Sequence, residues 1–249
     1  MPEGDSNPLV VVLGATGAQG GSVVKYLLGD PDKSFRVRAV TRNVDSARAK
    51  DLIAQNVEVV RANPDDLESI INAFNGAYGV FGTMVKETEI QHGKHLVDAA
   101  QAAKVKHFVW STLDHTSNPT VVHWETKAII DDYLKLSGVP RTSLYTSFYY
   151  ENFLTFPAFM FKKTEDGKIV AEWPYALTKG FIGGYSVGET GAYVLEALKG
   201  HEEWIEWFYV NHDNSVRDLA LTKHIYPARK DMYAFVEANK AEFMKIFDS

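Results

Sequence analysis

A glycine-rich turn near the start of the sequence connects a short apolar run to a helical pattern. The apolar run at residues 10–13 is typical of a buried strand, and Gly14, Gly17 and Gly20 lead from it into a helix expected over residues 20–28. In this order the first glycine permits a sharp turn, the second lets a pyrophosphate approach the backbone, and the third permits close packing of the helix on the strand. The alternative is an ordinary glycine turn, but the flanking strand and helix favour a phosphate-binding βα unit. The residues expected to contact a dinucleotide are Gly14, Ala15, Thr16, Gly17, Ala18, Gln19 and Gly20.

The end of the next predicted strand indicates which dinucleotide binds. Residues 35–40 alternate as a strand does, and Arg42 follows about twenty residues beyond the last glycine. A site for NAD places Asp or Glu here to bind the ribose 2′-hydroxyl, whereas Arg42 offers a planar cation for a 2′-phosphate. We therefore predict NADP(H) as the cofactor. The alternative is that Arg42 is a solvated surface arginine.

Strand and helix patterns continue to alternate along the chain. Further strands are predicted at residues 57–61, 77–82, 106–111 and 141–146, and helices at 44–55, 67–74, 89–103, 125–136, 187–199 and 231–243. Such alternation requires right-handed crossovers and a parallel sheet covered on both faces, with ligands at the carboxyl ends of the strands. We expect an α/β fold with a doubly wound Rossmann-type sheet in residues 1–155. A small α-rich C-terminal lobe in residues 156–249 should pack on it as part of one compact unit.

The turns after the third and fourth predicted strands should lie beside the adenine and ribose of the cofactor. The first of these turns contains Asp66, in an Asn-Pro-Asp-Asp sequence that also predicts a cap for the helix at residues 67–74. The second contains Gly82, Thr83 and Met84. We expect these four residues to contact the cofactor.

The composition excludes several classes of protein. With 249 residues, 45% of them hydrophobic, the chain has enough apolar material for one core and a small appendage. A net charge of −6 argues against a nucleic acid or an anionic membrane as partner. The absence of cysteine excludes disulfides and thiol catalysis, and we expect no metal. No apolar stretch is long enough to span a bilayer, so we expect a cytoplasmic protein, with access to the nucleus left open.

Several segments, in this order, resemble the NmrA-like branch of the atypical short-chain dehydrogenases. They are residues 14–22, 41–43, 93–100, 105–109, 123–127 and 147–152. The resemblance covers residues 8–200 and again residues 218–247. It implies a Rossmann-type fold with bound NADP(H), in a group that contains both NADPH-dependent reductases and regulators that bind the cofactor without turnover.

The resemblance also points to candidate catalytic residues. In the usual short-chain dehydrogenase a Tyr four residues before a Lys donates a proton, and the Lys lowers the pKa of the Tyr and holds the nicotinamide ribose. This chain has His123 at the Tyr position, and Lys127 is expected to hold the ribose or to act as the acid/base itself, as in isoflavone-reductase-like relatives. Ser111 stands where the family orients the substrate carbonyl. The alternatives are a capping or packing histidine, a helix-surface lysine and an ordinary strand-end serine.

By the same resemblance, Tyr149, Tyr150, Glu151 and Asn152 adjoin the nicotinamide half of the cofactor. The alternative for this run is aromatic core packing.

Two other constellations are discounted. Ser111, Asp114 and His115 lack the glycine pattern of a nucleophile elbow, so a hydrolase triad is not expected. His92 and His95 lack a third metal ligand, and we expect them on a solvated helix face.

The last third of the chain departs most from the family pattern. Trp204, Trp207 and Phe208 lead almost directly into the terminal region, without the long substrate-lining segment of relatives. A shortened lobe would open the nicotinamide side to water, and it would expose these aromatic residues unless a protein partner or a second subunit of a homodimer covers them.

Two functions follow from these patterns. The first is an NADPH-dependent oxidoreductase that acts on a small carbonyl, quinone or enone. The second is a non-catalytic NADP(H)-sensing regulator that binds a protein partner. A truncated or degenerate gene product is a third interpretation, which expression as a folded monomer would test.

Overall fold

The computed structural model describes residues 7–83, 88–116, 122–157, 161–166, 168–171, 184–200, 227–228 and 230–248. Contacts divide the chain into two compact units. The first comprises Met1–Thr146 and Thr190–Tyr209, and the second comprises Ser147–Glu189 and Val210–Ser249.

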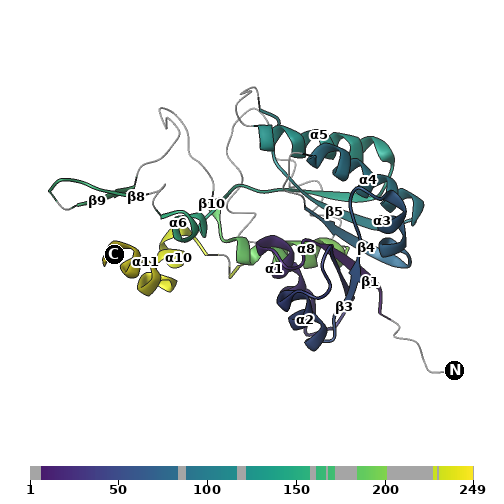
Figure 1. Ribbon diagram of the computed structural model, residues 1–249, viewed down its shortest axis with the longest axis horizontal. Coiled ribbons are helices and arrows are strands. Elements are labelled where there is room, and N and C mark those ends of the chain that lie inside the picture. The colour runs from purple at the N-terminus through teal and green to yellow at the C-terminus, as the bar shows by residue number, and fades with distance from the viewer. Residues whose placement is uncertain are drawn as a thin grey trace. The chain divides into compact units, whose positions relative to one another are not determined.

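The first unit contains a parallel six-stranded sheet (Figure 1). Its strands are β1 (Leu9–Leu13), β2 (Arg36–Thr41), β3 (Glu58–Arg61), β4 (Ala77–Gly82), β5 (His107–Thr112) and β6 (Arg141–Tyr145). They lie in the order β3-β2-β1-β4-β5-β6, and every neighbouring pair is parallel. The order reverses between β1 and β4, which is the switch point where doubly wound sheets bind ligands. The predicted doubly wound Rossmann-type sheet is therefore confirmed.

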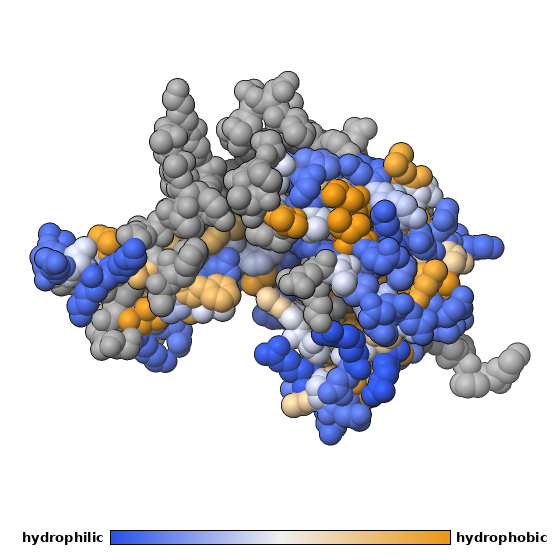
Figure 2. All heavy atoms as spheres, turned by 45° about the horizontal axis from the view of Figure 1, so that its top comes forward, coloured by the Kyte–Doolittle hydropathy of each residue, from blue (hydrophilic) through white to orange (hydrophobic). Residues whose placement is uncertain are grey.

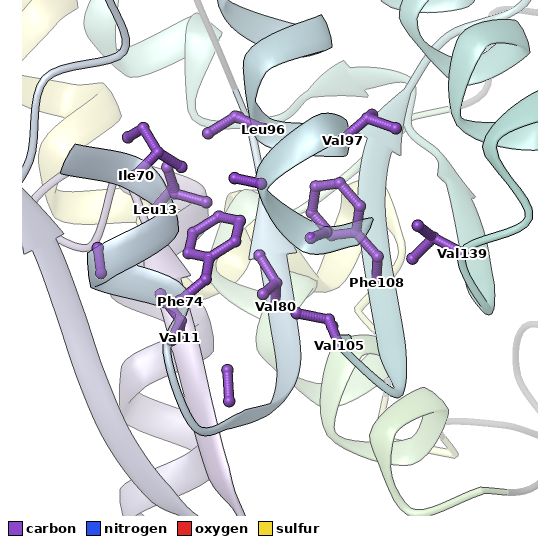
Figure 3. Packing of buried hydrophobic residues seen from close by; sticks show 14 of the residues in the cluster. Val11, Leu13, Ile70, Phe74, Val80, Leu96, Val97, Val105, Phe108 and Val139 are labelled. Carbon is purple, nitrogen blue, oxygen red and sulfur yellow. The ribbon is translucent and has the colours of Figure 1, made fainter. Parts of the chain in front are cut away.

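Six helices of the first unit cover this sheet. They are α1 (Ala18–Leu28), α2 (Ala47–Ala54), α3 (Leu67–Phe74), α4 (Glu89–Ala102), α5 (Val122–Ser137) and α8 (Thr190–Leu198). Helix α4 packs against both α3 and α5, and apolar side chains of these helices form the main core with the strands (Figure 3). In that core Phe74 and Phe108 are fully buried beside Val80. Burial of each large side chain contributes about 2–3 kcal/mol relative to exposure.

Helix α8 packs closely on α1. A Cβ on Gly191 would lie 2.3 Å from the backbone oxygen of Ser22, so only glycine permits this approach. The N–H of Gly191 also donates to Ser22 Oγ at 2.9 Å. At the end of α8, Leu198 contacts β4, where a Cβ on Gly79 would meet Leu198 Cδ2 at 2.6 Å. Helix α8 thus completes one face of the sheet in the first unit.

An ion pair fixes the chain just beyond α8. Lys199 Nζ lies 2.8 Å from Asp30 Oδ1 and 3.1 Å from Asp32 Oδ2, and the Asp30 side chain is 1% exposed. Burial acts to raise the pKa of Asp30, but hydrogen bonds from Lys199 and Ser34 outweigh it and lower the pKa from 3.8 to about 2. Asp30 therefore stabilises the fold in its ionised form.

Asp30→Asn is expected to lower the free energy of unfolding by about 1–2 kcal/mol at pH 7. The folded pKa lies below the unfolded pKa, so this contribution is complete above about pH 4 and disappears as the pH falls through about 2. Urea unfolding followed by circular dichroism across this range measures the difference. Asp32→Asn is the matched control, because Asp32 is 77% exposed and should change stability by less than about 0.5 kcal/mol. A loss for Asp30→Asn that is equally large at pH 2 and pH 7 would contradict the assignment.

The second unit is smaller and rich in aromatic side chains. Its elements are β7 (Phe148–Tyr149), α6 (Asn152–Thr155), β8 (Phe161–Lys163), β9 (Ile169–Ala171), β10 (Gly184–Tyr185), the 3-10 helix η1 (Val187–Glu189), α10 (Met232–Ala238) and α11 (Lys240–Asp248). Strands β8 and β9 form an antiparallel pair, and β7 pairs in parallel with β10. The buried cluster contains Tyr150, Phe153, Phe235 and Phe243.

The single terminal helix predicted over residues 231–243 is wrong, because the chain forms two helices that meet at Asn239. Asn239 leaves the helical conformation with φ −114° and ψ 17°, and its side-chain amide donates to the Phe235 carbonyl at 2.8 Å. Asparagine competes with the backbone for such bonds, which explains the break.

Hydrophilic side chains cover much of the described surface on the face seen in Figure 2, with small hydrophobic groups between them. None of the helices in the described ranges is long and apolar enough to cross a membrane. Trp204, Trp207 and Phe208, for which exposure is predicted, lie outside the described residues.

Candidate functional site

The sharp turn predicted at Gly14 and the close packing predicted at Gly20 are both present. Gly14 has φ +62°, in the left-handed region, and its carbonyl accepts the N–H of Gly17 at 2.8 Å. A Cβ on Gly20 would lie 2.3 Å from the Gly14 carbonyl oxygen and 2.7 Å from that of Leu13. Any side chain at Gly20 would therefore push α1 away from β1. The helix begins at Ala18, two residues earlier than predicted.

No side-chain hydrogen bond caps the N-terminus of α1, as is also the case for α4 and α6. In α2, α3 and α10 the side chains of Ser46, Asp66 and Asp231 accept a backbone N–H of the first turn. Helix α1 instead begins after Gly17, which has no side chain to cap it, and its first turn carries no acidic residue. Among the described residues, a Cβ on Gly17 would have the Gly14 carbonyl oxygen, at 3.2 Å, as its one neighbour within 4 Å. The first N–H groups of α1 and the positive end of its dipole thus fit an anionic phosphate.

Two arginines belong to the next βα unit, Arg42 directly after β2 and Arg48 in α2. Arg42 is exposed at the end of β2 and makes no hydrogen bond or ion pair within the described part of the chain, so its guanidinium is available to a ligand. Arg48, from α2, donates to the carbonyl oxygen of Thr16 at 2.8 Å and so contacts the turn itself. Sequence reasoning missed Arg48. The signal was a second arginine six residues after Arg42, in the helix that follows β2.

The structure brings the end of β4 to the same turn. Thr83 Cγ2 would lie 3.2 Å from a Cβ on Gly14, so Thr83 is adjacent to the first glycine. A Cβ on Gly82 would contact the rings of Phe108 and Trp110 at 2.8–2.9 Å. Met84 lies outside the described residues.

Asp66 caps a helix, as the Asn-Pro-Asp-Asp sequence predicts. Its carboxylate accepts the N–H of Ser69 at 3.2 Å and so caps α3. Whether Asp66 also contacts a cofactor stays a prediction.

Both the main-chain carbonyl and the side-chain ammonium of Lys127 have partners in the protein. Its carbonyl accepts hydrogen bonds from Trp110 Nε1 at 3.2 Å and from Thr112 Oγ1 at 3.1 Å, both on β5. Its ammonium forms an ion pair with Glu89 Oε1, at the start of α4. The Lys127 side chain is 12% exposed and that of Glu89 is 3% exposed. The alternative of a plain helix-surface lysine is therefore wrong.

No described hydrogen bond joins Ser111 to Lys127. Ser111 is fully buried, and its Oγ has no hydrogen-bond partner among the described residues. Because successive side chains of a strand point to opposite faces, Ser111 projects away from the face on which Trp110 and Thr112 contact Lys127. A buried hydroxyl without a partner is costly and fits a group that a ligand would satisfy. His123 lies in the first turn of α5, and its side chain is outside the described atoms.

The discounted hydrolase triad is absent in the described part of the chain. Both ring nitrogens of His115 lie 2.8 Å from carboxylates, Nδ1 from Glu125 Oε1 and Nε2 from Asp132 Oδ2. Hydrogen bonds to Glu125 and Asp132 raise the pKa of His115. Both nitrogens of the imidazole thus contact side chains of α5.

The expected solvated face for His92 is wrong. His92 is buried, with Nε2 2.6 Å from Asp65 Oδ1, and His95 Nδ1 lies 2.7 Å from the Pro64 carbonyl oxygen. Both histidines hold the turn between β3 and α3. The hydrogen bond to His92 lowers the pKa of Asp65. The described residues contain no cluster of three or more candidate metal ligands.

The predicted residues after β6 lie in the second unit. The ring of Tyr150 is buried 5.5 Å from that of Phe235, and Tyr149 packs edge-to-face on Tyr185 at 5.5 Å. Glu151 accepts hydrogen bonds from Ser186 Oγ and the N–H of Val187. Asn152 begins α6. Aromatic core packing therefore describes Tyr150, and contact of these four residues with a cofactor stays a prediction.

The reversed strand order, the glycine turn and the uncapped α1 define a Rossmann-type α/β protein with the geometry of a dinucleotide site. Residues 6–216 match the model of the NmrA-like family. The chain belongs to this family.

Known relatives include the NmrA-like family domain-containing oxidoreductase FrzB of a Cladobotryum species. It is 34% identical over 195 residues, which are 67% of this chain and 56% of the relative. The chain spans about half the length of the curated relatives that it matches.

Two solved structures show the same fold. The negative transcriptional regulator NmrA superposes with a TM-score of 0.68 at 24% identity, over 78% of this chain and 62% of that protein. The triphenylmethane reductase of a Citrobacter species, complexed with NADP(H), superposes with a TM-score of 0.59 at 25% identity, over 75% of this chain and 64% of that one.

Proposed function

We propose that this chain binds NADP(H) and is an NADPH-dependent oxidoreductase that reduces a small carbonyl, quinone or enone. The N-terminus of α1, directly after the glycine turn, carries the proposal, because no side chain caps it and the positive end of its dipole fits a phosphate. The names of its relatives support the same activity, since FrzB is called an oxidoreductase and the Citrobacter enzyme is a reductase with NADP(H).

The residues present fit this cofactor. The turn at residues 14–20 would hold the pyrophosphate, and Arg42 would pair with the 2′-phosphate. Arg48 braces the turn through Thr16. When bound, NADPH supplies a hydride.

Side chains of the protein would bind the ribose, supply the proton and orient the substrate. Lys127 would donate hydrogen bonds to the nicotinamide ribose and supply a proton to the substrate oxygen. Ser111 or His123 would orient the substrate.

NADPH is expected to bind about ten- to a hundredfold more tightly than NADH, and Arg42→Ala should remove most of this preference. The physical reason is a charge-assisted contact that only the 2′-phosphate can make. Isothermal titration of both cofactors into the wild type and Arg42→Ala measures the effect. Arg36→Ala is the matched control, since Arg36 is an exposed arginine at the opposite end of β2. Equal affinities of the wild type for the two cofactors would overturn the choice of NADP(H).

The second candidate is a cofactor-sensing regulator that binds a protein partner without turnover. His123 at the position of the usual proton-donating tyrosine favours it. Oxidation of NADPH against a panel of carbonyls, quinones and enones separates the two functions. Turnover supports the enzyme, whereas tight NADPH binding with no turnover across the panel supports the regulator.

A further inference from the structure

Helices α4 and α5 pack against each other where Gly93 faces Ile130. A Cβ on Gly93 would lie 2.4 Å from Ile130 Cδ1, so the absence of a side chain at Gly93 leaves room for Ile130 and allows the close approach. Glu89 lies one turn before Gly93 on α4, and Thr126 lies one turn before Ile130 on α5. The close approach therefore brings the Glu89 carboxylate to the first turns of α5.

Both oxygens of this carboxylate are engaged. Glu89 Oε1 pairs with Lys127 Nζ, and Glu89 Oε2 accepts Thr126 Oγ1 at 2.6 Å. At 3% exposure an ionised carboxylate needs a cation and hydrogen bonds to offset the loss of water. Lys127 supplies the charge and Thr126 supplies the second bond.

A helix-stabilising role is the simplest explanation for an acidic residue in a first turn, because it interacts favourably with the helix dipole. That role needs no partner and is usually played by an exposed side chain. Glu89 is instead buried and directed across to α5, at the residue that the proposed function places on the cofactor ribose.

We propose that Glu89 is a positioning residue for Lys127, which fixes the direction of its ammonium at the carboxyl end of β5. The role that this inference gives to Lys127 rests on the proposed function. The ion pair between Glu89 and Lys127 does not depend on it, because both groups belong to the protein. The carbonyl of Lys127 is hydrogen-bonded to side chains of β5, and its ammonium is paired with Glu89 of α4. In this position Lys127 serves as a donor of hydrogen bonds and protons.

The first test measures Lys127 without cofactor or turnover. Competitive labelling of lysine amines with acetic anhydride at one fixed pH, followed by mass spectrometry of the peptide that contains Lys127, gives the rate at which Lys127 is labelled relative to the other lysines. Glu89→Gln keeps the shape of the side chain and removes its charge, so Lys127 should no longer be held by the ion pair and should be labelled severalfold faster. Glu89→Asp should restore much of the wild-type value. Thr126→Val is the matched control, because it removes the other partner of the carboxylate and leaves the ion pair. Unchanged labelling of Lys127 in folded Glu89→Gln would overturn the proposal.

The second test connects the pair to the cofactor. NADPH affinity should fall about three- to tenfold in Glu89→Gln. Lys127→Met should weaken NADPH binding less when it is introduced into Glu89→Gln than when it is introduced into the wild type. Fully additive losses would contradict a role through Lys127. A wild type that binds no NADPH would refute the proposed function, and the labelling result would still decide the role of Glu89.

A third measurement covers the case in which Glu89→Gln does not fold. Removing both charges in Glu89→Gln/Lys127→Met should recover stability relative to Lys127→Met, which leaves a buried carboxylate unpaired. Urea unfolding of the two variants makes the comparison. A double variant that is less stable than Lys127→Met would show that Glu89 acts without Lys127.

Discussion

Lys127→Met is expected to lower turnover by about a hundredfold or more, the range found when a general acid or base is removed, and to weaken NADPH binding as well. Methionine keeps much of the length of the side chain but has no proton to give. Steady-state oxidation of NADPH with the best substrate of the panel measures the loss. His123→Phe should cost less, because the structure supports Lys127 from both β5 and α4.

The control for this variant has to separate chemistry from stability. Lys94→Met removes another lysine from the same helix pair, one whose ammonium lies 5.3 Å from the ring centre of Tyr133, and turnover should stay near that of the wild type. Glu89→Gln/Lys127→Met should be folded and equally inactive. A His123→Phe enzyme without activity beside an active Lys127→Met enzyme would overturn the assignment.

Gly17→Val should weaken binding of both NADPH and NADH by roughly a hundredfold, or about 2.7 kcal/mol, with little change in the fold. The new Cβ would lie 3.2 Å from the Gly14 carbonyl oxygen, which a shift of a few tenths of an ångström relieves, but the branched side chain would fill the space above the turn. Calorimetric titration beside circular dichroism separates binding from folding.

Two neighbouring glycines provide the comparison. Gly20→Val should damage the fold itself, since its Cβ would lie 2.3 Å from the Gly14 carbonyl oxygen. Gly21→Ala should be tolerated, because its Cβ would meet the Ala15 carbonyl oxygen at an ordinary 3.4 Å. Normal cofactor binding by folded Gly17→Val would refute the phosphate site.

Local patterns predicted most of the sheet, because each strand and its following turn are encoded within a few residues. The apolar run of β1, the alternation of β2 and the cap at Asp66 all depend on neighbours in sequence. The same locality explains why the sequence alone predicts the sharp turn at Gly14 and the close packing at Gly20.

Long-range pairings account for what the sequence did not indicate. Glu89 lies 38 residues before Lys127, and Asp65 lies 27 residues before His92, so no periodicity relates them. The burial of His92 follows from such a partner. Asn239 broke a helix whose apolar spacing was continuous, because a side-chain bond to Phe235 competed with the backbone.

The close crossing of α1 and α8 makes the first unit discontinuous in sequence. Gly191 and Ser22, which meet in this crossing, are 169 residues apart, and the segment from Ser147 to Glu189 is counted with the second unit. During synthesis the six strands therefore leave the ribosome well before the helix that covers α1. A fragment that ends after β6 would keep every strand of the sheet and lack this cover, so no single cut of the chain can release the first unit whole.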